Sequence, residues 1–264
     1  MNASLFQALA EALAATKIEQ KLALTATLAE NWNAGLLNID IPPSPQLACG
    51  RPEKPELVAP GAVQQRNPKS PEGRARLLHA IVHIEFSAIN LALDHAARFP
   101  GMPRQYYADW IGVAAEEAYH FQILRERLLS LGHDYGDFPA HGGLWEMAAK
   151  TSCDVLARMA LVPRLLEARG LDATPPIQRK LEQVGDHESA RVLDIILRDE
   201  ISHVGLGDTW FRQLCAERGL VAEATFRQLL NEFKAPWPSA PMNQSARLAA
   251  GFTAEELASL ASRH

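Results

Sequence analysis

The sequence predicts an all-α protein. Apolar residues recur at helical spacing through long segments of the chain. No stretch of any length alternates apolar and polar residues as a strand does. A further observation is a pair of Glu-x-x-His motifs, Glu117 to His120 and Glu200 to His203, each inside a helical segment. Positions i and i+3 share one face of a helix, so each motif can aim a carboxylate and an imidazole at one point.

Composition places the chain among soluble globular proteins. It has 264 residues, of which 47% are hydrophobic and 22% charged, and its formal net charge of −5 disfavours nucleic acid as a partner. No uncharged apolar run approaches the length that crosses a bilayer, and residues 1–13 lack the basic start of a signal peptide. Cys49, Cys153 and Cys215 are widely separated, as in proteins of reducing compartments. We therefore expect a cytoplasmic protein with no membrane association.

The first quarter of the chain contains two kinds of segment. Residues 3–34 are predicted to be helical, with a weak break near Thr16. Residues 36–71 contain eight prolines, which prevent long helices and favour extended chain. This segment is either a disordered linker or an ordered strap across the surface. Apolar residues between the prolines favour the strap: Leu36, Leu37, Ile39, Ile41, Leu57 and Val58.

The middle of the chain predicts a pair of antiparallel helices. Ser70-Pro71-Glu72 is a helix start, with a capping serine, proline at the first helical position and an acid in the first turn. This helix is expected to run to about Arg98. Residues 99–103 are too few for anything but a tight reversal, so the helix over 104–131 is predicted to be its antiparallel neighbour. A loop over 132–143 follows.

Further helices are predicted in the second half. One covers 144–169 with a kink at Pro163, and Thr174-Pro175 is expected to start a short helix. Helices are predicted from Asp186 to Arg218 and over 220–234, followed by a second strap over 235–241. Thr253 and Glu256 have the spacing of a capping box for a last short helix. We expect three parts packed as one globular unit: 1–71 (helices and strap), 72–218 (a four-helix bundle) and 219–264 (helices and strap).

Two Glu-x-x-His helices imply partners. A dinuclear carboxylate site in a four-helix bundle takes one Glu from each of two helices and a Glu-x-x-His from each of the other two. Glu85 is the lone carboxylate on an apolar helix face, and Glu167 is our choice in the third helical region. Glu85 precedes Glu117 by 32 residues and Glu167 precedes Glu200 by 33, so two hairpins of matching span would place all ligands at one level.

The third-helix ligand is the least determined of the set. Pro163 makes the register of its helix uncertain, and Glu146 and Asp154 remain rivals of Glu167. A different explanation of both Glu-x-x-His motifs is a pair of satisfied salt bridges in the core. A metal is the simpler explanation, since buried charges are costly unless they are paired or bind metal.

The pattern resembles the ligand set of the ferritin-like superfamily. The resemblance covers roughly residues 72–218, and the stretches HAIVHIEFSAINLALDHAARFPGMP, AAEEAYHF, GHDYGDFPAH and DEISHV are similar to an uncharacterised bacterial branch, the domain-of-unknown-function 455 family. It implies a four-helix bundle with a dinuclear metal site, but no substrate. The metal ligands that it implies are Glu85, Glu117, His120, Glu167, Glu200 and His203.

Two acids directly precede the motif glutamates. In related dinuclear enzymes an acid at this place accepts the free ring N–H of the histidine on the opposite helix and fixes its tautomer. The resemblance therefore assigns Asp199 to His120 and Glu116 to His203. The alternative for Glu116 is an ordinary solvated helix residue.

Carboxylates and imidazoles without a thiolate suit iron or manganese. We expect two iron ions, with manganese or a mixed iron/manganese pair as alternatives. The predicted function is an oxygen-activating oxidoreductase of the di-iron oxidase or monooxygenase type. Its catalytic residues would be Glu117 and Glu200, its substrates dioxygen and a small organic molecule, and its partner an electron-donor protein.

Other functions remain open at this level. They are iron oxidation and storage, metal buffering, and a metal-stabilised structural or partner-binding role. The additional segments at both ends favour the oxidoreductase, as a monomer or small homo-oligomer, because a storage subunit needs little beyond its bundle. Resemblance to transfer-RNA hydroxylases of the superfamily leaves a tRNA substrate open, although the acidic charge balance disfavours it.

Several residues near the motifs favour structural roles. His79 and His83 are four apart, but His83 lies about 200° around the helix from Glu85 and cannot join its site. Packing is the favoured role for this pair. Gly205 and Gly207 are unusual inside a helix and indicate either close helix contact or an access route.

Overall fold

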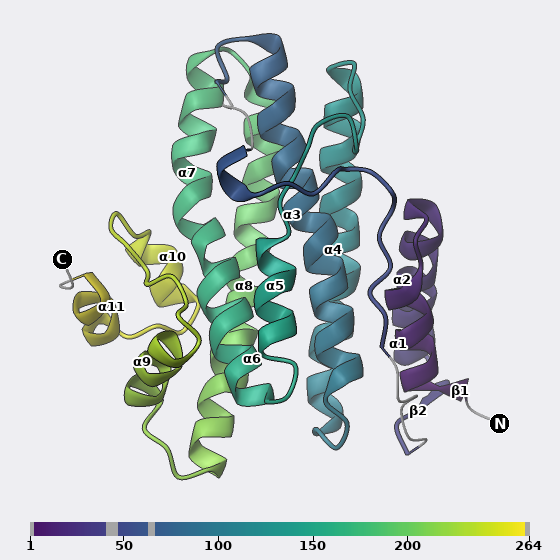
Figure 1. Ribbon diagram of the computed structural model, residues 1–264, viewed down its shortest axis with the longest axis vertical. Coiled ribbons are helices and arrows are strands. Elements are labelled where there is room, and N and C mark those ends of the chain that lie inside the picture. The colour runs from purple at the N-terminus through teal and green to yellow at the C-terminus, as the bar shows by residue number, and fades with distance from the viewer. Residues whose placement is uncertain (1–2, 41–46, 63–66, 262–264) are drawn as a thin grey trace. The chain divides into compact units, whose positions relative to one another are not determined.

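The structure is a computed structural model that describes residues 3–40, 47–62 and 67–261. Over these residues the chain is predominantly helical, and strand is confined to one two-residue parallel pair (Figure 1). The predicted all-α class is therefore confirmed. The chain divides into two compact units, Met1–Trp145 and Glu146–His264. The expected grouping of residues 72–218 into one bundle stays a prediction.

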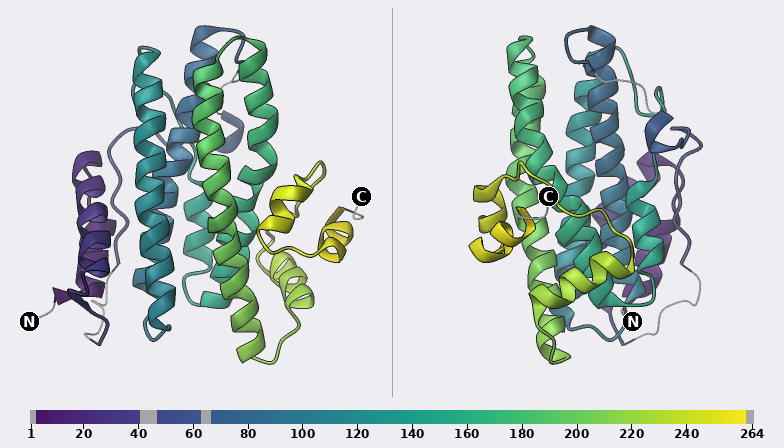
Figure 2. Two further views of the ribbon diagram at one scale, coloured as in Figure 1. Left: turned by 180° about the vertical axis from the view of Figure 1, so that it is seen from behind. Right: turned by 60° about the vertical axis from the view of Figure 1, so that its left-hand side comes forward.

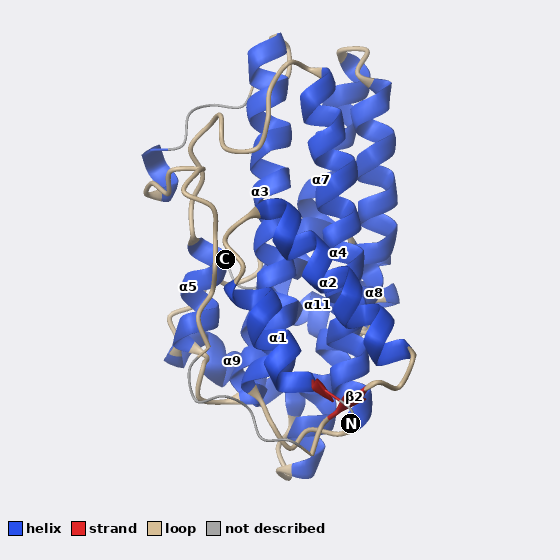
Figure 3. Cartoon of the chain, turned by 90° about the vertical axis from the view of Figure 1, so that its right-hand side faces the viewer, coloured by secondary structure: helices blue, strands red, loops and turns tan. Residues whose placement is uncertain are grey.

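The first unit begins with a helical hairpin. Helices α1 (Leu5–Ala14) and α2 (Ile18–Asn33) are separated at the predicted break around Thr16. Strand β1 (Ala3–Ser4) pairs in parallel with β2 (Leu37–Asn38), shown in red in Figure 3. The prediction of helix from residue 3 was wrong by two residues, because Ser4 is extended and its hydroxyl caps α1 by accepting from the Gln7 N–H.

The described part of the proline-rich segment is an ordered strap, as predicted. Its backbone pairs with the loop after α4: the Val58 N–H donates to the Ala140 carbonyl at 2.8 Å, and the Ala140 N–H to the Glu56 carbonyl at 3.0 Å. Upstream, the Gly50 N–H donates to the Leu13 carbonyl at the end of α1. A short 3₁₀ turn, η1 (Pro60–Ala62), follows. Parts of the predicted strap lie outside the described residues: 41–46 and 63–66.

The two longest helices of the first unit are α3 (Pro71–Arg98) and α4 (Arg104–Ser130), which run side by side (Figure 1). Helix α3 begins as predicted, with the Ser70 hydroxyl accepting from the Gly73 N–H at 3.0 Å. It is long and apolar enough to cross a membrane by length and composition alone, yet 72% of its apolar window is buried inside the protein. Such burial is typical of a core helix.

The second unit contains a helix with an irregular middle. Helix α5 (Gly143–Lys150) crosses the boundary between the units, and α6 (Val155–Leu161) continues into a π-helical turn, η2 (Val162–Glu167). The predicted kink at Pro163 is this π turn. Helix α7 (Ala168–Gln183) follows without a break.

The helix start predicted at Thr174-Pro175 was wrong, because α7 runs through both Pro175 and Pro176. Proline removes the N–H that would bond to the carbonyl four residues earlier, which for Pro175 is that of Leu171. The side-chain amide of Asn243 donates to this carbonyl at 3.1 Å. A segment 72 positions away thus satisfies the group that the proline leaves open.

The remaining helices follow the predicted order. Helix α8 (His187–Glu217) packs along α7, and α9 (Ala222–Glu232) and α10 (Gln244–Ala249) contact α8 (Figure 2). The sequence did not predict α10, which is capped by Asn243. The predicted capping box of α11 (Ala254–Ala261) is confirmed. The Thr253 N–H donates to Glu256 at 3.0 Å and the Glu256 N–H donates to Thr253 at 3.1 Å.

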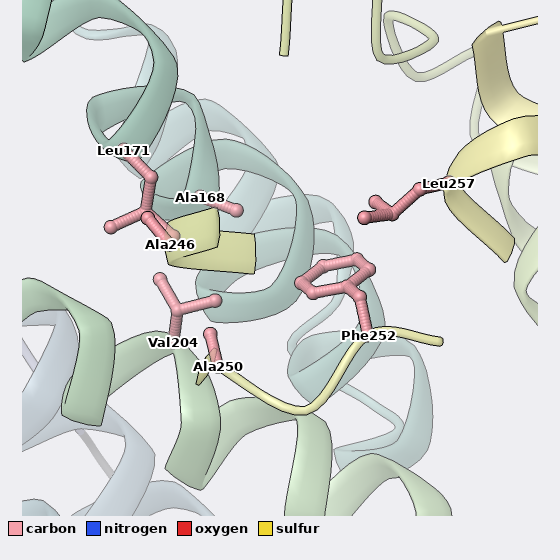
Figure 4. Packing of buried hydrophobic residues seen from close by; sticks show 7 residues of the cluster. All are labelled: Ala168, Leu171, Val204, Ala246, Ala250, Phe252 and Leu257. Carbon is pink, nitrogen blue, oxygen red and sulfur yellow. The ribbon is translucent and has the colours of Figure 1, made fainter. Parts of the chain in front are cut away.

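A compact apolar cluster fixes α10 and the segment after it on α7 and α8 (Figure 4). Phe252 and Leu257 come from the C-terminal segment and Val204 from α8. The cluster consists of Ala168, Leu171, Val204, Ala246, Ala250, Phe252 and Leu257. These side chains are at most 5% exposed, so the C-terminal helices share a core with the helix that carries the second Glu-x-x-His.

Lys21 provides a test of the α1–α2 hairpin. Its side chain is buried, and its ammonium donates to the carbonyls of Ala12 and Leu13 at the end of α1, at 3.0 and 2.8 Å. Burial disfavours the charged form and lowers the pKa of Lys21 to about 8. Between this value and the ordinary 10.5, the unfolded chain binds more protons than the folded one.

We therefore expect the free energy of unfolding to rise as the pH increases from 8 to 10.5, by roughly 3 kcal/mol from this residue. Urea unfolding across that range measures it. Because other groups also titrate there, the matched variant Lys21→Met isolates the contribution and should show a flatter profile. Parallel profiles for the two proteins would contradict the assignment.

Candidate metal centre

The first half of the candidate centre lies on α3. Glu85 is 4% exposed and faces inward among buried apolar neighbours on the same helix: Leu78, Val82, Phe86, Ile89 and Leu93. A carboxylate at such a position is costly unless a cation or a hydrogen-bond donor lies beside it.

The partner group comes from α4. Glu117 is 1% exposed and His120 is fully buried. The His120 Nδ1 atom lies 3.5 Å from Glu85 Oε2 and 3.6 Å from Glu117 Oε2. One potential ligand atom from each of Glu85, Glu117 and His120 lies within 4.8 Å of the corresponding atoms of the other two residues. The α3–α4 hairpin therefore brings together two carboxylates and one imidazole, as the sequence predicted.

Burial and the closeness of the two carboxylates dominate the electrostatics of this cluster. Burial and the neighbouring charge of Glu117 raise the pKa of Glu85 to about 7. Burial disfavours the charged form of His120, but hydrogen bonding and attraction to Glu117 and Glu85 outweigh it and raise the pKa of the imidazole to about 11. The three groups are therefore held together with protons supplying the positive charge.

The other Glu-x-x-His motif lies on α8, in the second unit. The imidazole of His203 is 1% exposed, and its Nδ1 atom lies 3.3 Å from Glu200 Oε1, one helical turn earlier. This geometry matches that of Glu117 and His120 on α4. Both Glu-x-x-His motifs thus present a carboxylate and an imidazole on one helix face, as their spacing predicted.

The structure separates Glu167 from its two rivals. Glu146 is exposed in the first turn of α5, and Asp154 caps α6 while pairing with Arg218 at 2.8 Å. Glu167 is half-buried and is the last residue of the π turn η2. Turns of this kind occur frequently at functional sites. Glu167 is therefore the best placed of the three, although its role as a ligand stays a prediction.

The two acids beside the motifs differ in their surroundings. Glu116 is exposed on α4. Asp199 is partly buried on α8, and the guanidinium of its neighbour Arg198 lies 2.9 Å away. Their assignment to the ring nitrogens of His203 and His120 stays a prediction.

His79 and His83 both hydrogen-bond to the loop after α4, in keeping with the packing role that was favoured for them. His79 Nε2 accepts from the Gly136 N–H at 2.9 Å. The His83 Nε2 faces the His141 carbonyl at 3.2 Å, so it carries the proton, and Nδ1 accepts from the Tyr135 hydroxyl at 2.9 Å. The loop after α4 is thereby fastened to α3.

Tyr135 is a residue near the site whose part sequence reasoning missed. Its buried ring packs against Phe86 and Phe121, with centroids 5.4 and 5.3 Å away, so three aromatic rings adjoin the helix segment that carries Glu85. Its position in a loop gave no periodic signal.

The fold and the site define an all-helical protein with a buried carboxylate–histidine cluster on α3 and α4. The chain belongs to the family described as "Protein of unknown function (DUF455)", whose model matches residues 14–258. It is also 51% identical over 213 residues to an uncharacterised protein of Haemophilus influenzae, a match that covers 78% of this chain and 74% of that one. No solved structure matches the chain significantly.

The electrostatics predict how the metal-free protein responds to pH. The pKa of Glu85 is raised, so the folded state binds more protons than the unfolded chain between pH 4.5 and about 7. Stability should therefore fall as the pH rises through that window. Glu85→Gln removes the titration, and we expect this variant to melt about 2–4 °C above the wild type at pH 8, as for a gain of about 1 kcal/mol.

Thermal unfolding followed by circular dichroism, with a chelator present and the pH stepped from 5 to 8, measures this difference. Glu116→Gln makes the same chemical change at an exposed position of α4 and serves as the control. A Glu85→Gln protein that melts below the wild type at pH 8 would show instead that the carboxylate belongs to a stabilising salt bridge.

Proposed function

We propose that this protein is a ferritin-like, dinuclear metal carboxylate protein that activates dioxygen to oxidise a small organic substrate. The observation that carries the proposal is the clustering of Glu85, Glu117 and His120 in the interior of a helical hairpin. Two carboxylates that repel each other away from water require a cation, and a metal ion supplies more positive charge than one imidazolium.

The available donor atoms fit iron or manganese. The cluster on α3 and α4 offers carboxylate oxygens and an imidazole nitrogen, and α8 offers the same pair from Glu200 and His203. No cysteine belongs to either group, and mixed oxygen and nitrogen donors suit iron or manganese. In the proposed centre Glu85, Glu117 and His120 hold one ion, while Glu167, Glu200 and His203 hold the second.

The chain's own residues would then bind and orient the metal ions and protect the site from water. Glu117 and Glu200 are the glutamates of the two Glu-x-x-His motifs, and we propose that each would hold metal beside the histidine of its own motif. Reduced iron held in this way supplies dioxygen chemistry. The aromatic rings of Phe86, Phe121 and Tyr135 support the oxidase reading, because apolar groups beside a site keep water from a strong oxidant.

The proposal predicts the metal content of the protein. Reconstituted wild-type protein should contain about two iron or manganese ions per chain. His120→Ala and Glu200→Ala should each lose at least one ion while remaining helical, because each removes a ligand from one half of the centre. Metal analysis by plasma mass spectrometry, with circular dichroism for the fold, measures both quantities.

Two controls separate ligation from a general effect of the substitutions. Glu146→Ala removes an exposed glutamate and His133→Ala a partly exposed loop histidine, and both should retain two ions. Carefully reconstituted wild-type protein without bound metal would rule out the dinuclear centre and leave the salt-bridge explanation.

The proposal also separates an oxidase from iron storage. The diferrous protein should consume dioxygen without accumulating an iron core and should remain a monomer or small oligomer. Glu117→Ala should abolish the reaction, because it removes a carboxylate that would hold metal in the proposed centre. An oxygen electrode and size-exclusion chromatography before and after aerobic iron loading provide the measurement. A large hollow assembly that accumulates hundreds of irons would favour storage instead.

A further inference from the structure

We propose that the π turn η2 is a positioning device, held open by Pro163, Gly207 and Arg164, that aims Glu167 at the second metal ion. This inference rests on the proposed function and deepens it, because it names the residues that position Glu167, the proposed ligand at the end of the π turn. All the contacts that carry it lie within the second unit.

The first observation is the packing of Pro163 on α8. A Cβ atom added to Gly207 would lie 2.5 Å from the Cβ and 2.7 Å from the Cγ of Pro163, closer than real Cβ contacts occur. Only glycine at 207 therefore lets the proline ring seat against α8. Proline lacks an N–H and crowds the carbonyl of the preceding turn, so it disfavours regular α-helix at this point. Gly207 thus accommodates Pro163, the residue that disfavours a regular α-helical turn here.

The second observation is the anchoring of Arg164, the next residue of the turn. Its guanidinium is fully buried and donates to Asp208 of α8 and to Glu256 of α11, both at 2.6 Å. Three phenylalanine rings surround it, those of Phe226, Phe252 and Phe211, with centroids 4.2, 4.6 and 5.0 Å away. These contacts hold the side chain to two other helices at once.

A second arginine closes the network. Arg212 of α8 donates to Asp208 at 2.7 Å and to Glu256 at 2.6 Å, so two guanidiniums and two carboxylates form a closed set. Each buried carboxylate is therefore paired twice. Carboxylates that are paired in this way avoid the penalty of an isolated buried charge.

The geometric consequence concerns Glu167, the last residue of the turn. A π turn accommodates one residue more than an α-helical turn, and one residue corresponds to about 100° of rotation about the helix axis. If the turn closed to regular α-helix, Glu167 would change its direction relative to α6 by about that angle. The contacts of Pro163 and Arg164 with α8 therefore fix the direction of the carboxylate relative to the helix that bears Glu200 and His203.

The test compares two glycine substitutions two residues apart. Gly207→Ala should displace Pro163, whereas a Cβ at Gly205 would lie 3.7 Å from Ala250, an ordinary contact, so Gly205→Ala is the matched control. Mn²⁺ titration, with free ion counted by electron paramagnetic resonance, measures the stoichiometry and affinity of both sites without any turnover. We expect Gly205→Ala to bind two ions like the wild type. Gly207→Ala should retain one and bind the second at least tenfold more weakly.

A double-mutant cycle separates positioning from general destabilisation. If Gly207 acts through Glu167, adding Glu167→Ala to Gly207→Ala should weaken the second site no further than either change alone. Additive losses would overturn the inference, as would wild-type binding of both ions by a folded Gly207→Ala protein. Pro163→Ala, which restores a backbone N–H and removes the ring, should give the same loss and replaces Gly207→Ala if that variant does not fold. Wild-type protein that binds no Mn²⁺ and no iron would remove the proposed function itself.

Discussion

The repulsion between two buried carboxylates is the constraint on which the first unit depends. Glu85 and Glu117 occupy positions on α3 and α4 where apolar residues would pack without electrostatic cost. Only His120 supplies nearby positive charge in the cluster on these two helices. A protein selected only for stability would gain by replacing such a group with apolar side chains. The burial of both carboxylates in an otherwise apolar interior is therefore the observation on which the proposed metal site rests.

Hydrogen bonds and ring contacts join the segments that surround the cluster. The loop after α4 is fastened to α3 through His79 and His83, and Tyr135 brings its ring against Phe86 and Phe121. The strap pairs with the same loop through Val58. In the proposed metal site, such support around Glu85, Glu117 and His120 would lower the cost of binding an ion.

The second unit differs from the first, because it contains the π turn η2 at the position of the predicted ligand Glu167. The π turn is supported by Gly207 on α8, and Arg164 is held by acids from α8 and α11. The C-terminal helices therefore do more than extend the core.

Sequence reasoning succeeded where the signals are local. The Ser70 cap, the Thr253–Glu256 capping box and the break near Thr16 depend on residues within one or two turns, so spacing alone determined them. Sequence reasoning failed where a group distant in the sequence changes which local backbone structure is stable. Proline at 175 would ordinarily begin a helix, but the amide of Asn243 satisfies the carbonyl of Leu171 and lets α7 continue.

The same division holds for the candidate site. Helical periodicity by itself determined that Glu117 and His120, and Glu200 and His203, share a face, because positions three apart are always neighbours on a helix. Only the tertiary structure decided that Glu146 is exposed while Glu167 ends a π turn, and that Arg164 is buried between acids. These facts depend on which helix faces pack together, and packing is set by side chains far apart in the sequence.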